Sequence, residues 1–268
     1  MAYRSTTTFH AAGAGALIAV SIALTFDARA QTSAPQTAPA TAPFSKDCQV
    51  GATQIADESP LPNVASVLAK RKTMRILTMG ASPAPSGRHG GYSDLIESIL
   101  ERALKGIDVV MINRGFSGEL AADAAFRMKN EVALVEPDLV LWQVGTNDAL
   151  AYVPADQFAA TLKEQIDWLK AHKVDVVLVG LQFASQMLRD AHYTEIRDTL
   201  RKVAAQENVI VVRYYEAMQF VEQAAREGGV SAEEFDLTES GSNCLAQYVA
   251  RAITLGVFAK NLPRRGQR

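Results

Sequence analysis

The sequence predicts a single doubly wound α/β domain in which helices flank a five-stranded parallel sheet. Short apolar runs alternate with longer amphipathic segments along most of the chain. The runs are continuous and rich in Val, Ile and Leu, as expected for strands that helices cover on both faces. With 268 residues, 48% of them hydrophobic, the chain can form one core of ordinary size, and it contains no internal repeat.

Five of the apolar runs are expected to be the strands, at 74–79, 108–113, 138–144, 174–180 and 208–214. The segments between them carry apolar residues at three- and four-residue steps, which is typical of helices with one buried face. These helices are expected at 92–104, 117–135, 156–172 and 190–207, with a last helix at 242–260. Because ligands of open parallel sheets bind beyond the carboxyl ends of the strands, the site is expected in the loops at that edge.

The N-terminus is typical of a signal peptide over residues 1–30. Arg4 precedes the apolar stretch 11–26, which is shorter than the roughly 20 residues needed to span a bilayer and is followed by a small-x-small cleavage sequence. An uncleaved membrane anchor is the alternative. Residues 31–45, rich in Ala, Pro and Thr, are expected to be a solvated linker, and 46–262 the folded domain. The protein is therefore expected to be periplasmic or secreted, without membrane contact after signal cleavage.

The charge pattern excludes some partners. The formal net charge is -2 and the basic residues are scattered, so nothing indicates nucleic-acid binding. The sequence contains no metal or cofactor motif, and it does not indicate an oligomeric state. A neutral or weakly charged small molecule is therefore the default substrate.

The two cysteines, Cys48 and Cys244, are expected to form a disulfide. Two cysteines in an exported chain most simply pair with each other, although two unpaired buried thiols are the alternative. The bond would join the N-terminal arm to the last helix. By the chain-entropy model it would remove roughly 5 kcal/mol of unfolded-state entropy.

Three candidate site residues follow the first three predicted strands. Ser82 ends the segment MGAS, where a serine serves either as a nucleophile or as a turn or helix cap. Gly115 lets a backbone N–H face a bound oxygen, although a tight turn also explains a glycine there. Asn147 can aim an amide donor into the same space, or it is a turn residue. Such donors would form an oxyanion hole, in which one donor contributes about 10²- to 10³-fold in rate.

The segments ILTMGAS, VVMINRGFSGE and PDLVLWQVGTND resemble the first three motif blocks of the SGNH/GDSL hydrolases in order, spacing and strand placement. The resemblance covers nearly the whole mature domain and implies a flavodoxin-like fold. It implies that Ser82 is the nucleophile, and that its N–H, the Gly115 N–H and the Asn147 amide form the oxyanion hole. Ala81 replaces the family aspartate. The sequence is especially similar to exported bacterial members that end in Asp-x-x-His-x-x-x-x-Gly-x-x-Cys, which the cysteine pairing suits.

The last motif departs from this family pattern because it contains no histidine. Aligning EEFDLTESGSNCLA by Gly241 and Cys244 places Asp236 at the histidine position and Glu233 at the aspartate position. A shifted register places Glu239 at the histidine position instead. The resemblance therefore implies Ser82, Asp236 and Glu233 as the catalytic set.

A serine hydroxyl is a poor nucleophile until a base removes its proton. Asp236 would be a weak base, because the reference pKa of aspartate is about 3.9 against about 6.5 for histidine. Burial and the neighbouring Glu233 would raise that pKa. His89 and His192 are alternative bases from the loops at the catalytic edge, whereas His172 is expected at the opposite edge.

Two functions follow from these residues. The first is an ester hydrolase or acyl transferase that acts on a small or carbohydrate-linked ester through an acyl-Ser82 intermediate. The second is a non-catalytic protein that uses the same pocket to bind an acylated glycan or envelope component. A purely structural envelope protein is a third class, and no sequence feature favours it.

Overall fold

The computed structural model describes the parts of the chain that build the sheet and its helices. These are residues 44–50, 55–56, 59–80, 91–183, 187–226 and 239–259. All of them belong to the compact unit Ala38–Arg268, whereas the other compact unit, Met1–Thr37, lies outside the described residues. The predicted signal peptide and most of the predicted linker therefore lie outside the described residues.

Five parallel strands form the sheet in the order β2-β1-β3-β4-β5, which confirms the predicted fold class. They are β1 (Thr73–Gly80), β2 (Asp108–Asn113), β3 (Leu139–Gln143), β4 (Asp175–Val179) and β5 (Ile210–Val212). After β2 the chain crosses back past β1 to form β3, so the strand order reverses between β1 and β3. In doubly wound sheets such a switch point opens the crevice where ligands bind.

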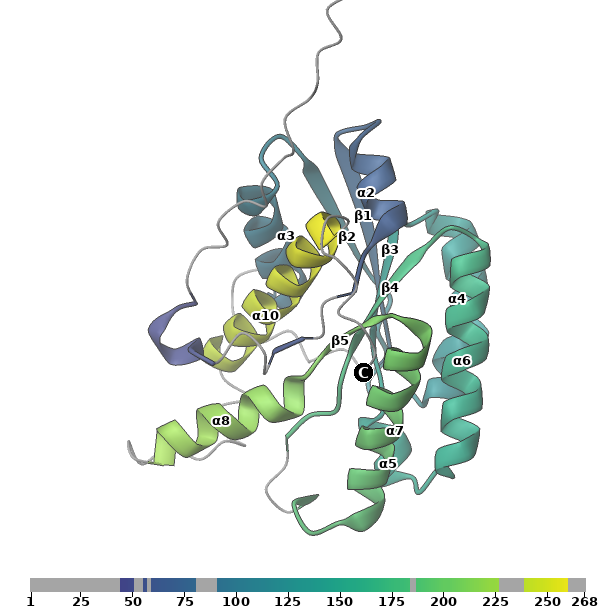
Figure 1. The fold of residues 1–268 in the computed structure, drawn as a ribbon, viewed down its shortest axis with the longest axis vertical. Coiled ribbons are helices and arrows are strands. Elements are labelled where there is room, and N and C mark those ends of the chain that lie inside the picture. The colour runs from purple at the N-terminus through teal and green to yellow at the C-terminus, as the bar shows by residue number, and fades with distance from the viewer. Residues whose placement is uncertain are drawn as a thin grey trace, which may run out of the picture. The chain divides into compact units, whose positions relative to one another are not determined.

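Helices cover both faces of the sheet (Figure 1). One face carries α3 (Gly91–Ala103) and α10 (Glu239–Phe258), which pack against each other. The other carries α4 (Ala121–Val135), α6 (Ala155–Ala171) and α7 (Ala191–Glu207). The shorter elements η1 (Lys46–Cys48), α2 (Pro62–Leu68) and α5 (Thr146–Leu150), together with α8 (Tyr214–Arg226), were not predicted from the sequence.

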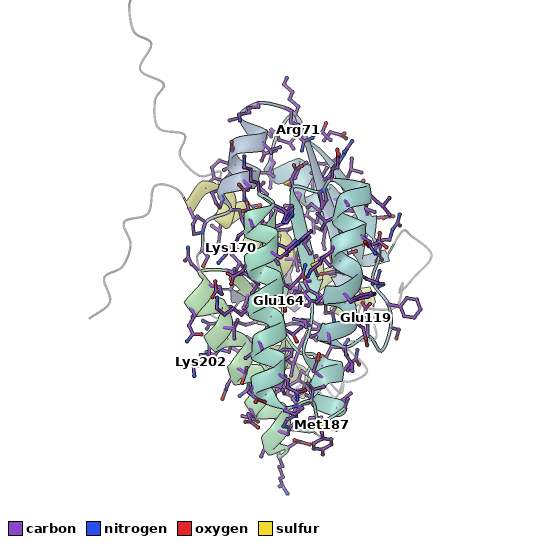
Figure 2. The ribbon with its side chains drawn as sticks, turned by 90° about the vertical axis from the view of Figure 1, so that its right-hand side faces the viewer. Arg71, Glu119, Glu164, Lys170, Met187 and Lys202 are labelled. Atoms are coloured by element: carbon purple, nitrogen blue, oxygen red, sulfur yellow. A yellow bond between two sulfur atoms is a disulfide. The ribbon has the colours of Figure 1, made fainter. Side chains whose placement is uncertain are left out.

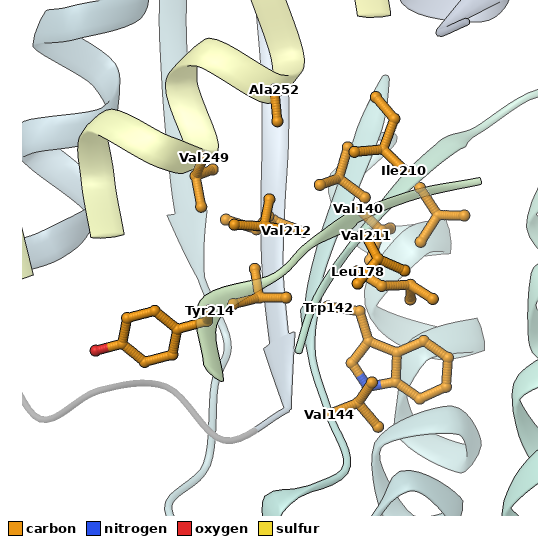
Figure 3. Packing of buried hydrophobic residues seen from close by; sticks show 14 of the residues in the cluster. Val140, Trp142, Val144, Leu178, Ile210, Val211, Val212, Tyr214, Val249 and Ala252 are labelled. Carbon is orange, nitrogen blue, oxygen red and sulfur yellow. The ribbon is translucent and has the colours of Figure 1, made fainter. Parts of the chain in front are cut away.

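The apolar strands form the core, as their composition predicts. Figure 3 shows side chains of β3, β4 and β5 packed together, with Val249 and Ala252 of α10 beside Val212. Trp142, in the middle of β3, has no exposed surface. Burying one such large apolar side chain contributes about 1.5–3 kcal/mol, so the core strands define a rigid frame for the loops at their ends.

Strand β5 is shorter than the apolar run 208–214. Asn208 adopts a left-handed conformation with a φ of 52° and ends α7, where its N–H bonds to the main chain of the last turn. Asparagine tolerates this conformation better than most residues, which explains its place at a helix end. At the other end of the run, Tyr214 already begins α8.

Two aspartates hold the amino ends of the central strands. Asp138, just before β3, accepts a hydrogen bond from the N–H of Arg75 at 2.9 Å and pairs with Arg71. Asp175, the first residue of β4, accepts from the N–H of Val64 at 2.9 Å. Both aspartates therefore have a structural role at the amino edge of the sheet. The candidate site is expected at the opposite, carboxyl edge.

A disulfide joins Cys48 in η1 to Cys244 in α10, which confirms the predicted pairing. Both residues are buried, and because they are bonded to each other the alternative of two unpaired buried thiols is wrong. Tyr248 adds to this attachment, because its hydroxyl donates to the carbonyl of Cys48 at 3.0 Å and its ring meets Phe44 edge-on. Among the described ranges, no helix combines the length and apolar character needed to cross a membrane.

Candidate active site

The candidate site lies at the switch point, where β1 and β3 end side by side. Gly80 ends β1 two residues before Ser82 and has a φ of +80°. A Cβ on Gly80 would lie 2.0 Å from the carbonyl oxygen of Gln143 at the end of β3. Only glycine permits this approach. The end of β1, two residues before Ser82 in the sequence, is therefore in close contact with the end of β3.

The loop after β2 is bonded to the end of β1. The N–H of Arg114 donates to the carbonyl of Thr78 at 2.9 Å, and the N–H of Phe116 donates to the carbonyl of Gly80, also at 2.9 Å. Gly115 lies between these two hydrogen bonds. The structure thus holds Gly115 beside the end of β1, next to the start of the segment that contains Ser82.

The Gly115 N–H has a partner in this structure. It donates to the side-chain oxygen of Asn113 at 2.9 Å, and the same oxygen accepts from the hydroxyl of Thr78 at 3.1 Å. A short polar side chain that bonds the backbone two residues onward is a common turn device of asparagine. An oxyanion would have to replace Asn113 as the acceptor of this donor.

Asn147 lies in the first turn of α5, directly after β3. Its side-chain nitrogen donates to the carbonyl of Glu119 at 3.0 Å. A carboxamide carries two N–H donors, so this bond fixes the orientation of the group while the second donor is left. That second donor has no partner among the described residues. Asn147 is partly exposed, so a ligand can approach it.

Gly145 positions Asn147 by preceding α5 in a left-handed conformation, with a φ of +106°. A Cβ at Gly145 would lie 2.6 Å from the side chain of Leu181, which follows β4. The next residue, Thr146, binds the same loop, since its hydroxyl accepts from the N–H of Gln182 at 3.0 Å. The loops after β3 and β4 are therefore fastened together.

Asp148 links α5 to α4. Its carboxylate accepts from the N–H of Ala121, the first residue of α4, at 2.9 Å. A negative charge at a helix N-terminus satisfies a free N–H and interacts favourably with the helix dipole. Asp148 is only 2% exposed, and burial raises the pKa of its carboxyl group. Sequence analysis missed this role, because nothing in WQVGTND identifies a partner 27 residues away.

The described histidines differ in position as predicted. His192 lies in the first turn of α7, at the carboxyl edge, where its ring stacks on Tyr152 with centroids 5.3 Å apart. Its Nδ1 lies 3.4 Å from the carboxylate of Glu195, and its Nε2 is buried without a hydrogen-bond partner among the described residues. His172 ends α6 at the opposite edge and stacks on Trp168.

The other predicted residues lie outside the described part of the chain. These are Ser82, His89, Glu233 and Asp236. Glu239 begins α10, but its side chain is not among those described. The structure thus brings Gly115 and Asn147 to one edge of the sheet, while the roles of the nucleophile and of the base stay predictions.

A hollow of about 550 Å³ lies elsewhere on the domain. Side chains from α7, from the two flanks of β5 and from Ser59 line it, and they include Arg201 and Lys202. None of the predicted site residues belongs to it. The chemistry of the switch point, rather than this hollow, therefore defines the candidate site.

Exposed apolar side chains occur on the loops and on the short helix α5 around the candidate site. Phe116 follows β2 and is 69% exposed, Leu150 and Tyr152 follow β3, and Leu188 follows β4. Phe126 and Leu134 on α4 are exposed to a similar or greater extent, so exposure of apolar side chains alone does not mark this edge as a binding surface.

The fold places the end of the second motif block, after β2, and the end of the third, after β3, at the carboxyl edge of the sheet. The chain belongs to the non-GDSL lipase-like family, whose model matches residues 47–259. The predicted membership of the SGNH/GDSL hydrolases is thereby confirmed.

Individual relatives agree with this assignment. An arylesterase from Vibrio mimicus is 29% identical over 120 residues, which are 42% of this chain and 58% of that protein. The lipase/acylhydrolase from Enterococcus faecalis has a TM-score of 0.56 at 23% identity, over 68% of this chain and 95% of that one. An acetylxylan esterase from Geobacillus stearothermophilus has a TM-score of 0.55 at 17% identity, over 67% of this chain and 94% of that one. At these identities the two solved structures establish the shared fold.

Proposed function

We propose that the protein is an ester hydrolase or acyl transferase that works through an acyl-Ser82 intermediate. The observation that carries this proposal is the arrangement at the switch point. There, Gly115 is bonded into place beside the end of β1 and the Asn147 amide has one donor left for a ligand. Membership of a lipase-like family supports the same class of reaction.

In the proposed first step, Asp236 takes the proton of the Ser82 hydroxyl while the oxygen attacks the ester carbonyl carbon. The carbonyl electron pair moves onto its oxygen, which the N–H groups of Ser82 and Gly115 and the Asn147 amide bind. Collapse of this intermediate expels the alcohol, which receives the proton from Asp236. Water, or an acceptor hydroxyl in a transferase, then repeats the sequence on acyl-Ser82 and releases the acyl group.

The hydrogen bond between Gly115 and Asn113 is compatible with this mechanism. An amide oxygen is a neutral acceptor, whereas the developing oxyanion carries charge and forms hydrogen bonds about twice as strong. The donor therefore gains most by changing partner when charge has developed. An interaction that strengthens only in the transition state raises turnover.

The proposed base predicts slow turnover. An aspartate with an ordinary pKa accepts a proton poorly, and the nearby Glu233 would raise the pKa of Asp236 by like-charge repulsion. His89, His192 and Glu239 are the other candidates. Of these, His192 already contacts Glu195 and Tyr152, which hold its ring in one place.

The proposed substrate is a small or carbohydrate-linked ester. Phe116, Leu150 and Tyr152 at this edge offer apolar surface against which an acyl chain or the face of a sugar ring can pack. The relatives named arylesterase and acetylxylan esterase act, as their names say, on aryl esters and on the acetyl esters of xylan, and the second of these is carbohydrate-linked. We further propose that residues 1–30 direct export and that the mature protein is periplasmic or secreted.

A non-catalytic role is the second candidate. It is favoured by the absence of a histidine from EEFDLTESGSNCLA and by the occupied Gly115 N–H. In that case the same pocket would bind an acylated glycan or envelope component without turning it over.

The two candidates are separated by the hydrolysis of p-nitrophenyl esters of two to eight carbons. An enzyme shows slow turnover that Ser82→Ala and Asp236→Asn abolish and that Asp236→His raises. A binding protein gives no turnover above the Ser82→Ala background. Turnover that survives in Asp236→Asn but disappears in His89→Gln or His192→Gln would move the base to that histidine.

A further inference from the structure

Arg127, on the second turn of α4, binds Glu119 with two hydrogen bonds. Its Nε lies 2.7 Å from one carboxylate oxygen and its Nη2 lies 3.0 Å from the other. The Glu119 side chain is 5% exposed, and that of Arg127 is 32% exposed. Figure 2 labels Glu119 near the start of α4. Paired hydrogen bonds between a guanidinium and a buried carboxylate fix geometry as well as adding energy, unlike single ion pairs on the surface.

The same guanidinium reaches the other side of the loop. Nη2 of Arg127 also donates to the carbonyl of Arg114 at 2.7 Å. Residues 114 and 119 flank the part of the β2–α4 loop that contains Gly115. One side chain therefore fixes this loop at two points.

Glu119 connects this arrangement to the other oxyanion donor. Its main-chain carbonyl accepts the hydrogen bond of the Asn147 side chain at 3.0 Å. A shift of Glu119 would thus move the Asn147 amide, and a shift of the loop would move the Gly115 N–H. Arg127 thus contacts a residue next to each donor, because Arg114 precedes Gly115 and Glu119 accepts the hydrogen bond of the Asn147 amide.

We propose that Arg127 is a positioning residue for the oxyanion hole, acting through Arg114 and Glu119 on Gly115 and Asn147. The catalytic consequence of this proposal depends on the proposed ester chemistry. Arg127 itself does not touch the substrate. Removing it should therefore lower kcat and leave KM within about twofold, because the donors act on the transition state.

The test compares Arg127→Met and Arg127→Lys with Lys129→Met, on the wild-type background. Lys129 lies on the same helix and forms an exposed ion pair with Glu164, so its loss is a matched control. We expect Arg127→Met to lower kcat for p-nitrophenyl acetate about 10- to 100-fold, the cost of misplaced donors. Lysine cannot make the paired bonds, so Arg127→Lys should recover only part of kcat.

Amide hydrogen exchange gives a readout that does not need turnover. We expect residues 114–120 to exchange faster in Arg127→Met than in the wild type, and Lys129→Met to leave them unchanged. If Arg127→Met fails to fold, Glu119→Gln replaces it in the test. Glutamine keeps the shape of the side chain, so this variant should also speed exchange of residues 114–120, but to a smaller extent.

Loss of kcat equal to that of Lys129→Met would overturn the proposal, as would a rise in KM at constant kcat. A wild type without Ser82-dependent turnover would end the ester proposal instead. The exchange measurement would then decide alone. Unchanged amide exchange rates of residues 114–120 in both Arg127→Met and Glu119→Gln refute the positioning role, and faster exchange supports it.

Discussion

Removing the Cys48–Cys244 disulfide should cost the protein much of its stability. The two cysteines are 196 residues apart in the sequence. For a loop of this length the chain-entropy model gives roughly 5 kcal/mol at 25 °C, because the cross-link restricts the unfolded chain. One kcal/mol shifts the Tm of a domain this size by about 2–4 °C, so the loss corresponds to roughly 10–20 °C.

Urea unfolding of Cys48→Ala/Cys244→Ala beside the oxidised wild type measures this loss. The m value should also be larger without the bond, since the uncrosslinked unfolded chain exposes more surface. Reduced wild type, which keeps both sulfur atoms, controls for the altered side chains. A loss under about 1 kcal/mol with an unchanged m value would show that the cross-link does not act through the unfolded state.

Three further substitutions test the site. Gly80→Ala places a Cβ against the Gln143 carbonyl in a residue with positive φ. It should lower the free energy of unfolding, measured by urea titration, by roughly 2–5 kcal/mol, and a loss under about 1 kcal/mol would contradict the close contact. Asn147→Ala should lower kcat about 10²- to 10³-fold in ester hydrolysis with little change in Tm, and unchanged turnover would remove it from the oxyanion hole. Burial raises the pKa of Asp148, so between the ordinary aspartate pKa of about 3.9 and this raised value Asp148 holds a proton in the folded protein more readily than in the unfolded chain. The contribution of Asp148 to the free energy of unfolding should therefore fall as pH rises through this window, and the difference between the wild type and Asp148→Asn, which cannot ionise, should change accordingly in urea unfolding across pH.

The sheet could be predicted from the sequence because its strands are short, apolar and separated by amphipathic helices. The ends of the strands could not be predicted in the same way, because an apolar run does not show which residue leaves the sheet. Asn208 and Tyr214 extend the last run although they belong to a helix end and a helix start. The five-residue α5 has too few turns for a helical period to emerge.

The positions of Gly115 and Asn147 were predicted from their places after β2 and β3. The groups that hold them were not. Asn113, Glu119 and Arg127 act through contacts between side chains and backbone, and no periodicity reports such contacts. A capping or clamping partner becomes visible only when the fold brings distant segments together, as it does for Asn147 and the carbonyl 28 residues before it.

The disulfide also changes what a single proteolytic cut can do. Its two ends enclose nearly all of the folded unit, so cleavage of any one peptide bond between residues 48 and 244 leaves both fragments covalently joined. A nicked molecule would keep its mass on a non-reducing gel and separate into two pieces only after reduction. In a compartment that contains proteases, such a molecule could still hold its sheet together after its backbone is no longer continuous.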